Sequence, residues 1–320
     1  PENTLSVGLF GGSVALEVRR QLTSQIQQKL RELGDLRQVD IKLFAAGGLK
    51  QPQQLMQLNF ALTIGYEFDI VINLDGYNEA VLGISENYDR GVSPYFPRLW
   101  EKRLQGYAQQ QAPWETEMEN RRNQYRETRK LFNNAVIKNL AVVGLPLSLV
   151  LREQRNKIFL ANQHLSKSKP PNDLEHRGQS FANKTRSEAS MLIVDQWLKS
   201  SLMMQHLGEL YGYQYIHFIQ PNQYLAGSKV LSEEELSSAI DSSSKRASLI
   251  RQNYPTMLTL GRNSSENAGL QFVDLTLLFI DEPRTLYKDV CCHLNKLGNE
   301  LLAKAVVDHL HGYLAGGTED

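Results

Sequence analysis

Residues 5–14 read LSVGLFGGSV, a short apolar run that leads directly into a glycine-rich turn. A run of this length that ends at glycine is typical of a buried β-strand. From residue 14 to residue 30, apolar side chains recur every four positions with charged residues between them, and Gly34 follows. This pattern predicts an amphipathic helix over residues 14–33 that ends at the glycine. The start of the chain is therefore expected to be a strand, a tight turn and a helix.

The same order of strand and helix continues along the chain. Apolar runs typical of buried strands occupy residues 5–10, 39–45, 68–74, 215–219 and 270–275. Further helical patterns occupy residues 52–65 and 294–314. Strands that alternate with helices imply a mostly parallel sheet with helices on both faces. We therefore expect an α/β fold with a parallel sheet of about five strands, formed by residues 1–320 as one domain.

One long segment departs from this alternation. Residues 98–139 are rich in Gln, Glu and Arg and are expected to form one or two long helices interrupted near Pro113. Residues 162–188 are polar and turn-rich, which indicates a loop or partial disorder, and a helix is expected from about residue 187 to residue 211. We interpret residues 95–190 as a helical insertion within the domain. Because it leaves the chain after the third strand, we expect it to border the mouth of a site at that edge of the sheet.

The composition and the start of the chain indicate which partners and which cellular compartment to expect. Lys plus Arg and Asp plus Glu number 35 each, so the net charge is zero and no basic field favours nucleic acid as a partner. The two cysteines, Cys291 and Cys292, are adjacent, a spacing that disfavours a disulfide, and two thiols alone cannot form a structural zinc site. The chain starts at Pro1 without a Met, which leaves room for a removed signal peptide or membrane anchor. A periplasmic or secreted location, with membrane proximity, is therefore favoured over a cytoplasmic one.

Ser13 lies where a parallel sheet usually collects functional groups, beyond the carboxyl end of a strand. It opens the expected helix, where backbone N–H groups and the helix dipole favour negative charge. Gly11 and Gly12 before it allow a substrate to approach the backbone closely. Two other interpretations stay open: a serine that only caps the helix, and a dinucleotide-binding loop, for which the glycine spacing is poor.

Two further segments carry polar residues at comparable places. Gly76-Tyr77-Asn78 follows the third strand, and the side-chain amide of Asn78 could donate a hydrogen bond to an oxyanion. Asp289 and His293 precede the last helix, and a histidine with a nearby acid can act as a base and the group that orients it. Taken alone, the Asn78 segment is better explained by ordinary turn residues. A surface histidine near the start of a helix is also a common explanation for His293.

Taken together, the segments resemble the SGNH/GDSL hydrolase superfamily. Its members carry a nucleophilic serine in a G-D-S or G-G-S turn after the first strand, and a glycine after the second. A G-x-N turn follows the third strand, and an Asp–His pair precedes the last helix. The corresponding residues here are Gly11-Gly12-Ser13, Gly47-Gly48, Gly76-Tyr77-Asn78, and Asp289 with His293. The resemblance covers the chain except for residues 95–190, and it implies a flavodoxin-like three-layer sandwich.

The resemblance also implies a chemistry. Ser13 would be the nucleophile, His293 its base, and Asp289 the group that fixes the histidine tautomer. The N–H of Ser13, the N–H of Gly48 and the amide of Asn78 would form the oxyanion hole. Such a serine esterase needs no metal and no organic cofactor, and its substrate would be a small-molecule or carbohydrate ester. An O-acyl group on a carbohydrate or on a cell-envelope polymer is one such substrate.

The sequence departs from the superfamily pattern at two positions. Gly12 stands where an aspartate is common, which leaves the nucleophile in place. The acid usually lies three residues before the histidine, but that position is Val290, and Asp289 lies four residues before. A bulge can absorb one extra loop residue, so Asp289 remains the predicted acid, with Asp274 as a fallback.

Two alternatives to an esterase of this type stay open. A chain that kept the fold and lost the chemistry would be a glycan-binding or scaffold protein. A lipase would need a wide apolar channel, against which the polar insertion argues. Hydrogen-bond contact between Ser13 and His293 would favour an enzyme, whereas a histidine turned away would favour the non-catalytic protein.

Overall fold

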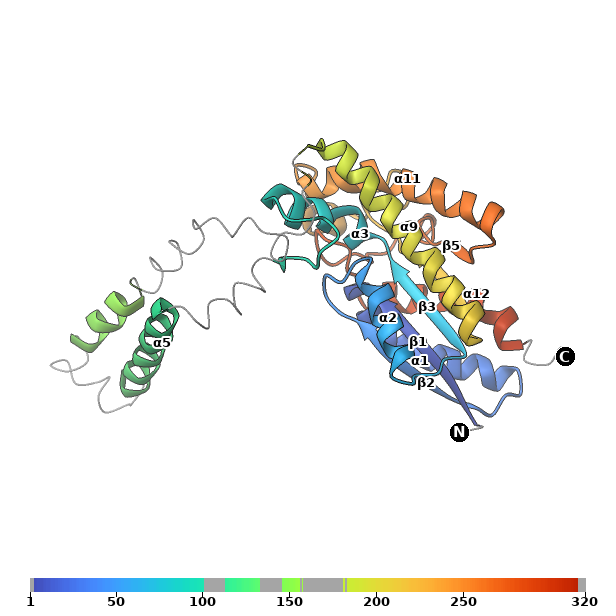
Figure 1. Ribbon diagram of the computed structural model, residues 1–320, viewed down its shortest axis with the longest axis horizontal. Coiled ribbons are helices and arrows are strands. Elements are labelled where there is room, and N and C mark those ends of the chain that lie inside the picture. The colour runs from blue at the N-terminus through green and yellow to red at the C-terminus, as the bar shows by residue number, and fades with distance from the viewer. Residues whose placement is uncertain are drawn as a thin grey trace. The chain divides into compact units, whose positions relative to one another are not determined.

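The computed structural model describes residues 3–100, 113–132, 146–155, 157, 181 and 183–315. The chain forms two compact units, one made of Pro1–Arg98 with Gln179–Asp320 and the other of Leu99–Gly178. The first unit contains the sheet and all of the candidate site residues (Figure 1).

The centre of the first unit is a five-stranded sheet. Its strands are β1 (Thr4–Gly11), β2 (Gln38–Ala45), β3 (Ile70–Asp75), β4 (Gln214–Ile219) and β5 (Phe272–Asp274). They lie in the order β2-β1-β3-β4-β5, and every neighbouring pair is parallel. This is the strand order of flavodoxin-like folds, in which ligands bind beyond the carboxyl ends of the strands. The predicted α/β class with a parallel sheet of about five strands is confirmed.

Seven α-helices accompany the sheet among the described residues of this unit. They are α1 (Ser13–Glu32), α2 (Gln53–Thr63), α3 (Tyr77–Leu82), α9 (Arg186–Tyr211), α10 (Glu233–Ser238), α11 (Lys245–Ala268) and α12 (Lys296–Ala315). Two short turns of helix, Gly83–Asn87 and Tyr88–Arg90, follow α3. The sequence patterns had indicated α1, α2, α9 and α12, each within about two residues at either end.

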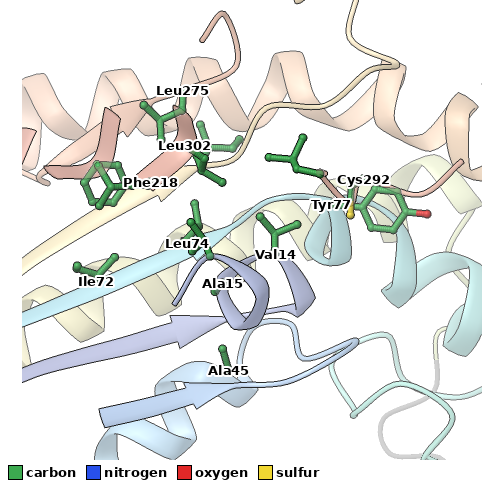
Figure 2. Packing of buried hydrophobic residues seen from close by; sticks show 14 of the residues in the cluster. Val14, Ala15, Ala45, Ile72, Leu74, Tyr77, Phe218, Leu275, Cys292 and Leu302 are labelled. Carbon is green, nitrogen blue, oxygen red and sulfur yellow. The ribbon is translucent and has the colours of Figure 1, made fainter. Parts of the chain in front are cut away.

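The sheet is covered on both faces because alternate side chains of each strand point to opposite sides. On one side, Leu9, Ile72, Leu74 and Phe218 share a buried cluster with α1 and α12, which pack against each other (Figure 2). The side chains from α1 and α12 in that cluster include Val14, Ala15, Val18, Leu22, Leu302 and Val306. On the other side, Phe10, Val71 and Tyr215 share a second cluster with α2 and α9. The result is a three-layer arrangement of helices, sheet and helices.

The second unit contributes α5 (Pro113–Phe132), and residues 146–155 are also helical. The helix begins at Pro113, where proline suits the first helical position because it needs no N–H partner there. The predicted loop at residues 162–188 falls mostly outside the described residues. A helical insertion over residues 95–190 that borders the site stays a prediction. In the described part of the chain, no helix is both long enough and apolar enough to cross a bilayer.

Candidate active site

Ser13 is the first residue of α1, directly beyond the end of β1. The capping position is occupied by Gly12, and no side chain caps this helix. Ser13 is therefore not the helix cap that a plainer interpretation of the turn would require. Its hydroxyl lies 2.7 Å from Nε2 of His293, a residue 280 positions further along the chain. The seryl Oγ thus meets an imidazole nitrogen at the N-terminus of a helix, where developing negative charge is favoured.

Asp289 lies on the other side of the imidazole. Its Oδ2 is 2.6 Å from Nδ1 of His293, and its Oδ1 accepts a hydrogen bond from the N–H of Cys291 at 2.9 Å. A carboxylate that accepts from the N–H two residues later folds the chain into a tight turn. That turn absorbs the extra residue between acid and histidine. Val290, which occupies the usual position of the acid, has 48% of its surface exposed.

Asp274, the fallback acid, takes no part in this arrangement. It lies at the end of β5, where its carboxylate accepts hydrogen bonds from Arg262 and from the N–H and hydroxyl of Thr276. These partners close the strand end, which is a structural role.

The loop that carries Asp289 and His293 is held by two side chains that follow β4. Gln223 Nε2 donates to the carbonyl of Asp289 at 2.9 Å, and the Tyr224 hydroxyl donates to the carbonyl of Val290 at 2.9 Å. Both Gln223 and Tyr224 are buried. Because a buried donor cannot exchange its partner for water without a free-energy cost, these bonds restrict where the loop can place the carboxylate.

Glu235 on α10 holds the start of the same loop. Its Oε1 accepts from the N–H groups of Leu286 and Tyr287, at 2.8 and 3.0 Å. Its Oε2 accepts from the N–H of Ser232 and pairs with the Lys229 ammonium, each at 2.9 Å. Burial alone would raise the pKa of Glu235, but the hydrogen bonds to its carboxylate outweigh burial, and the pKa lies below its usual range. Glu235 is therefore a charged anchor for the loop.

Hydrogen bonding sets the charge states of the pair. The bond to Asp289 raises the pKa of His293 above its ordinary value of 6.5, although burial acts in the opposite direction. Burial raises the pKa of Asp289. The hydrogen bonds from His293 and from the N–H of Cys291 together have the larger effect, so the pKa lies below its ordinary value. Asp289 is thus ionised at neutral pH and stabilises positive charge on the imidazole.

The three turns beyond β1, β2 and β3 converge beside Ser13. Asn78, the second residue of α3, donates from Nδ2 to the carbonyl of Leu49 at 2.7 Å, which ties the third turn to the second. A Cβ placed on Gly12 would lie 2.2 Å from the same nitrogen. A side chain at position 12 would require Asn78 to move, because Asn78 packs directly on the backbone of Gly12. Since an amide nitrogen carries two hydrogens, Asn78 keeps a second donor beyond the one that Leu49 accepts.

Gly48 in the second turn is covered by an arginine. Its φ of +78° favours glycine, and a Cβ there would lie 2.0 Å from Cδ of Arg98. Arg98 itself makes a two-pronged ion pair with Glu86, at 2.7 and 2.8 Å, and Glu86 also pairs with Arg246 at 3.3 Å. Gly48 is buried under this cluster, which places positive charge against the turn.

One buried carboxyl group links the second and third turns. Glu79 accepts from the N–H of Gly76 at 2.9 Å with one oxygen, and from the N–H of Gln51 and the amide of Gln54 with the other, at 3.2 and 3.0 Å. Burial raises the pKa of Glu79 to about 8, and the nearby Asp75 carboxylate adds to this effect. Glu79 directly follows Asn78 in the chain, so it fixes the position from which Asn78 donates.

A second chain of serine, histidine and aspartate lies inside the sheet. His217 contacts Ser201 Oγ through Nδ1 at 2.7 Å and Asp75 Oδ1 through Nε2 at 2.9 Å. Asp75 also accepts from Trp197 and Asn73, each at 2.9 Å. All five side chains are buried, so no substrate can reach Ser201. This network satisfies polar groups in the core, where His217 is fully buried.

The sequence did not indicate Glu79, Glu235 or the Arg98–Glu86 pair. Their functional contacts are with backbone groups or side chains that are distant in sequence, and no motif marks such partners. The contact of Gln223 with the carbonyl of Asp289 likewise requires the tertiary structure.

Comparison with known proteins found matches among solved structures only. No family model matches the sequence. No curated protein matches it either. The chain matches solved structures of two esterases and of a GDSL-like lipase over nearly its full length, at low sequence identity.

These three structures illustrate the range of sequence identity and TM-score. An acetyl xylan esterase has 12% identity and a TM-score of 0.43, over 96% of this chain and 100% of its own. An acetyl-xylooligosaccharide esterase from Geobacillus has 9% identity and a TM-score of 0.42, over 98% and 95%. A GDSL-like lipase from Parabacteroides merdae has 10% identity and a TM-score of 0.39, over 98% and 96%.

Proposed function

We propose that this protein is a serine ester hydrolase of the SGNH/GDSL type. The observation that carries the proposal is the linear contact of three side chains, with Ser13 Oγ 2.7 Å from His293 Nε2 and His293 Nδ1 2.6 Å from Asp289 Oδ2. A hydroxyl, an imidazole and a carboxylate in this order form an activated nucleophile. Unlike the buried set around His217, this set is partly exposed to solvent, so a substrate can reach it.

The proposed reaction proceeds by acyl transfer. His293 Nε2 takes the proton from Ser13 Oγ as that oxygen attacks the ester carbonyl carbon, and the carbonyl π electrons move onto oxygen. The intermediate collapses, and His293 gives its proton to the departing alcohol. Water then attacks the acyl-enzyme, with His293 as base, and the acid leaves while Ser13 regains its proton. Asp289 holds Nδ1–H throughout and stabilises the transient imidazolium.

The oxyanion would be stabilised by donors from three turns. These donors would be the N–H of Ser13 at the helix N-terminus, the second N–H of Asn78 in the third turn and the N–H of Gly48 in the second. The bonds from Asn78 to Leu49 and from Glu79 to both turns support this role, because prearranged donors stabilise charge without reorganisation. As for substrate, we propose a small-molecule or carbohydrate ester, such as an O-acyl group on a carbohydrate or cell-envelope polymer.

Covalent labelling with a fluorophosphonate tests the proposal most directly. The reagent should modify one serine per chain, and peptide mapping should locate the modification at Ser13. The Ser13→Ala variant should remain unlabelled, while a Ser24→Ala variant, which changes an exposed serine on the same helix, should label fully. A scaffold or glycan-binding protein would not react, and labelling at another serine would refute the assignment of Ser13.

We expect Asn78→Ala to lower kcat by about 10²–10³, with a much smaller change in KM. The reason is that the donor acts on charge that appears only in the transition state. An Asn59→Ala variant, which changes an exposed residue on α2, serves as the control and should keep its activity. A loss seen mainly in KM would assign Asn78 to substrate binding instead.

The rate should depend on pH through His293. Only the neutral imidazole can accept the proton of Ser13, so kcat/KM is expected to fall as pH decreases through the pKa of His293. The bond to Asp289 raises that pKa, so the acid limb of the profile should have its midpoint above 6.5. A pH–rate profile with a water-soluble ester measures this midpoint, and a midpoint well below 6.5 would contradict the expected ion pair.

A further inference from the structure

Cys291 and Cys292 place both of their sulfur atoms on the same side of the backbone. Side chains of adjacent residues in an extended chain point to opposite sides, but residues 289–292 form a bend. The two Sγ atoms lie 3.4 Å apart. A ring nitrogen of His293 lies close by. This nitrogen and the two sulfur atoms all lie within 4.8 Å of one another. Neither thiol has a place in the proposed reaction.

This set of donors matches what a soft divalent ion requires. Two thiolates and one imidazole are typical ligands of zinc, and a bound water can complete a tetrahedral site. Zinc–sulfur bonds of about 2.3 Å and zinc–nitrogen bonds of about 2.0 Å put tetrahedral ligand atoms about 3.5–3.8 Å apart. The sulfurs are already near that spacing, so the histidine nitrogen needs to move by only about 1 Å.

The ion can enter from the solvent side of the site. Cys291 is partly exposed, and the His293 side chain retains 22% of its surface. Cys292 lies deeper, 3% exposed, in the same buried cluster as Tyr77 (Figure 2). The deeper thiol would anchor the ion, and the outer two groups would close on it.

We propose that Cys291, Cys292 and His293 form an inhibitory site for a soft divalent cation such as Zn²⁺ or Cd²⁺. Both ring nitrogens of His293 are already engaged, with Ser13 and with Asp289. A bond from either nitrogen to the ion must therefore break one of these two contacts. The triad therefore cannot be intact while the ion is bound. The part of this inference that concerns inhibition rests on the proposed esterase function.

Binding can be measured without any assay of catalysis. Titration of the reduced protein with Cd²⁺ should produce a thiolate-to-cadmium absorption band in the ultraviolet that saturates at one ion per chain. Cys291→Ser should weaken binding at least tenfold, and Cys291→Ser combined with Cys292→Ala should abolish the band. Ser13→Ala frees one ring nitrogen of His293 and should bind Cd²⁺ at least as tightly as the parent protein. An absent band, or a full band in the double variant, would overturn the site.

Inhibition is the second measurement. Zn²⁺ and Cd²⁺ should reduce ester hydrolysis to below a tenth of the metal-free rate, EDTA should restore it, and Mg²⁺ should have no effect because it prefers oxygen ligands. Each variant is compared with its own metal-free rate, and the double cysteine variant should resist inhibition. His206→Gln, which removes an exposed histidine on α9, is the control and should leave inhibition intact. Cadmium binding without inhibition would refute the link to His293, whereas a parent protein that binds Cd²⁺ but hydrolyses no ester would refute only the esterase proposal.

Discussion

Ser13→Ala is expected to lower kcat for ester hydrolysis by about 10⁶, to the level that the remaining groups provide without a nucleophile. The change removes only the Oγ atom that lies 2.7 Å from His293 Nε2. The helix should keep its start, because Gly12 and not Ser13 is the capping residue. Substrate affinity should change little, since the oxyanion donors and the backbone of the turn remain.

The measurement is a comparison of initial rates for the parent protein, Ser13→Ala and the control Ser24→Ala, with far-ultraviolet circular dichroism to verify folding. Ser24 lies on the same helix, and its hydroxyl donates to the carbonyl of Arg20 on the surface. Its replacement should leave the rate within about twofold, as expected for a surface substitution. An unchanged rate in a folded Ser13→Ala variant would overturn the whole functional proposal.

Asp289→Asn should lower kcat by about 10⁴ while leaving the loop in place. The asparagine oxygen can still accept from the N–H of Cys291, so the turn that carries His293 keeps its hydrogen bond. The amide cannot hold Nδ1–H of His293 as a carboxylate does, and it favours the tautomer with a proton on Nε2, which cannot accept the proton of Ser13. Loss of the negative charge should also move the acid limb of the pH profile to lower pH, because the bond with Asp289 raises the pKa of His293.

Asp274→Asn is the matched control for this experiment, since Asp274 is the other acid that the sequence offered. Its partners are Arg262 and Thr276, so its replacement should affect stability more than rate. A loss of less than tenfold in Asp289→Asn, with an unmoved pH profile, would show that His293 works with Ser13 as a dyad.

Much of the fold was predictable because strand and helix patterns differ in period. The runs around Val7, Ile41, Ile72 and Ile216 are short and apolar, and each became a strand of the sheet. In contrast, the 24-residue helix α11 was not predicted. It contains Pro255, which usually ends a helix, and serines precede it, so the local pattern resembles a loop. Packing of its buried face in the main cluster outweighs these local preferences.

The candidate site was predictable to the extent that turns after strands can be located in the sequence. Ser13 and Asn78 lie in such turns, His293 precedes the last helix, and their roles were assigned by resemblance to SGNH/GDSL hydrolases. The structure brings Ser13 and His293 into contact. The fit of Asp289 depends on a bend over residues 289–292, which no spacing rule reveals. The contact of Glu235 with the N–H of Leu286 joins residues 51 positions apart and arises only when the sheet has assembled.

The position of Glu79 has a consequence for local motion. One side chain accepts hydrogen from the amides of Gly76 and Gln51, which lie in two different turns. If the Glu79 side chain moves away, both amides lose their acceptor at the same time and become exposed to solvent together. The two amide protons should therefore exchange with deuterated solvent at similar rates, as members of one cooperative opening unit. The oxyanion side of the site would then open and close as a single piece.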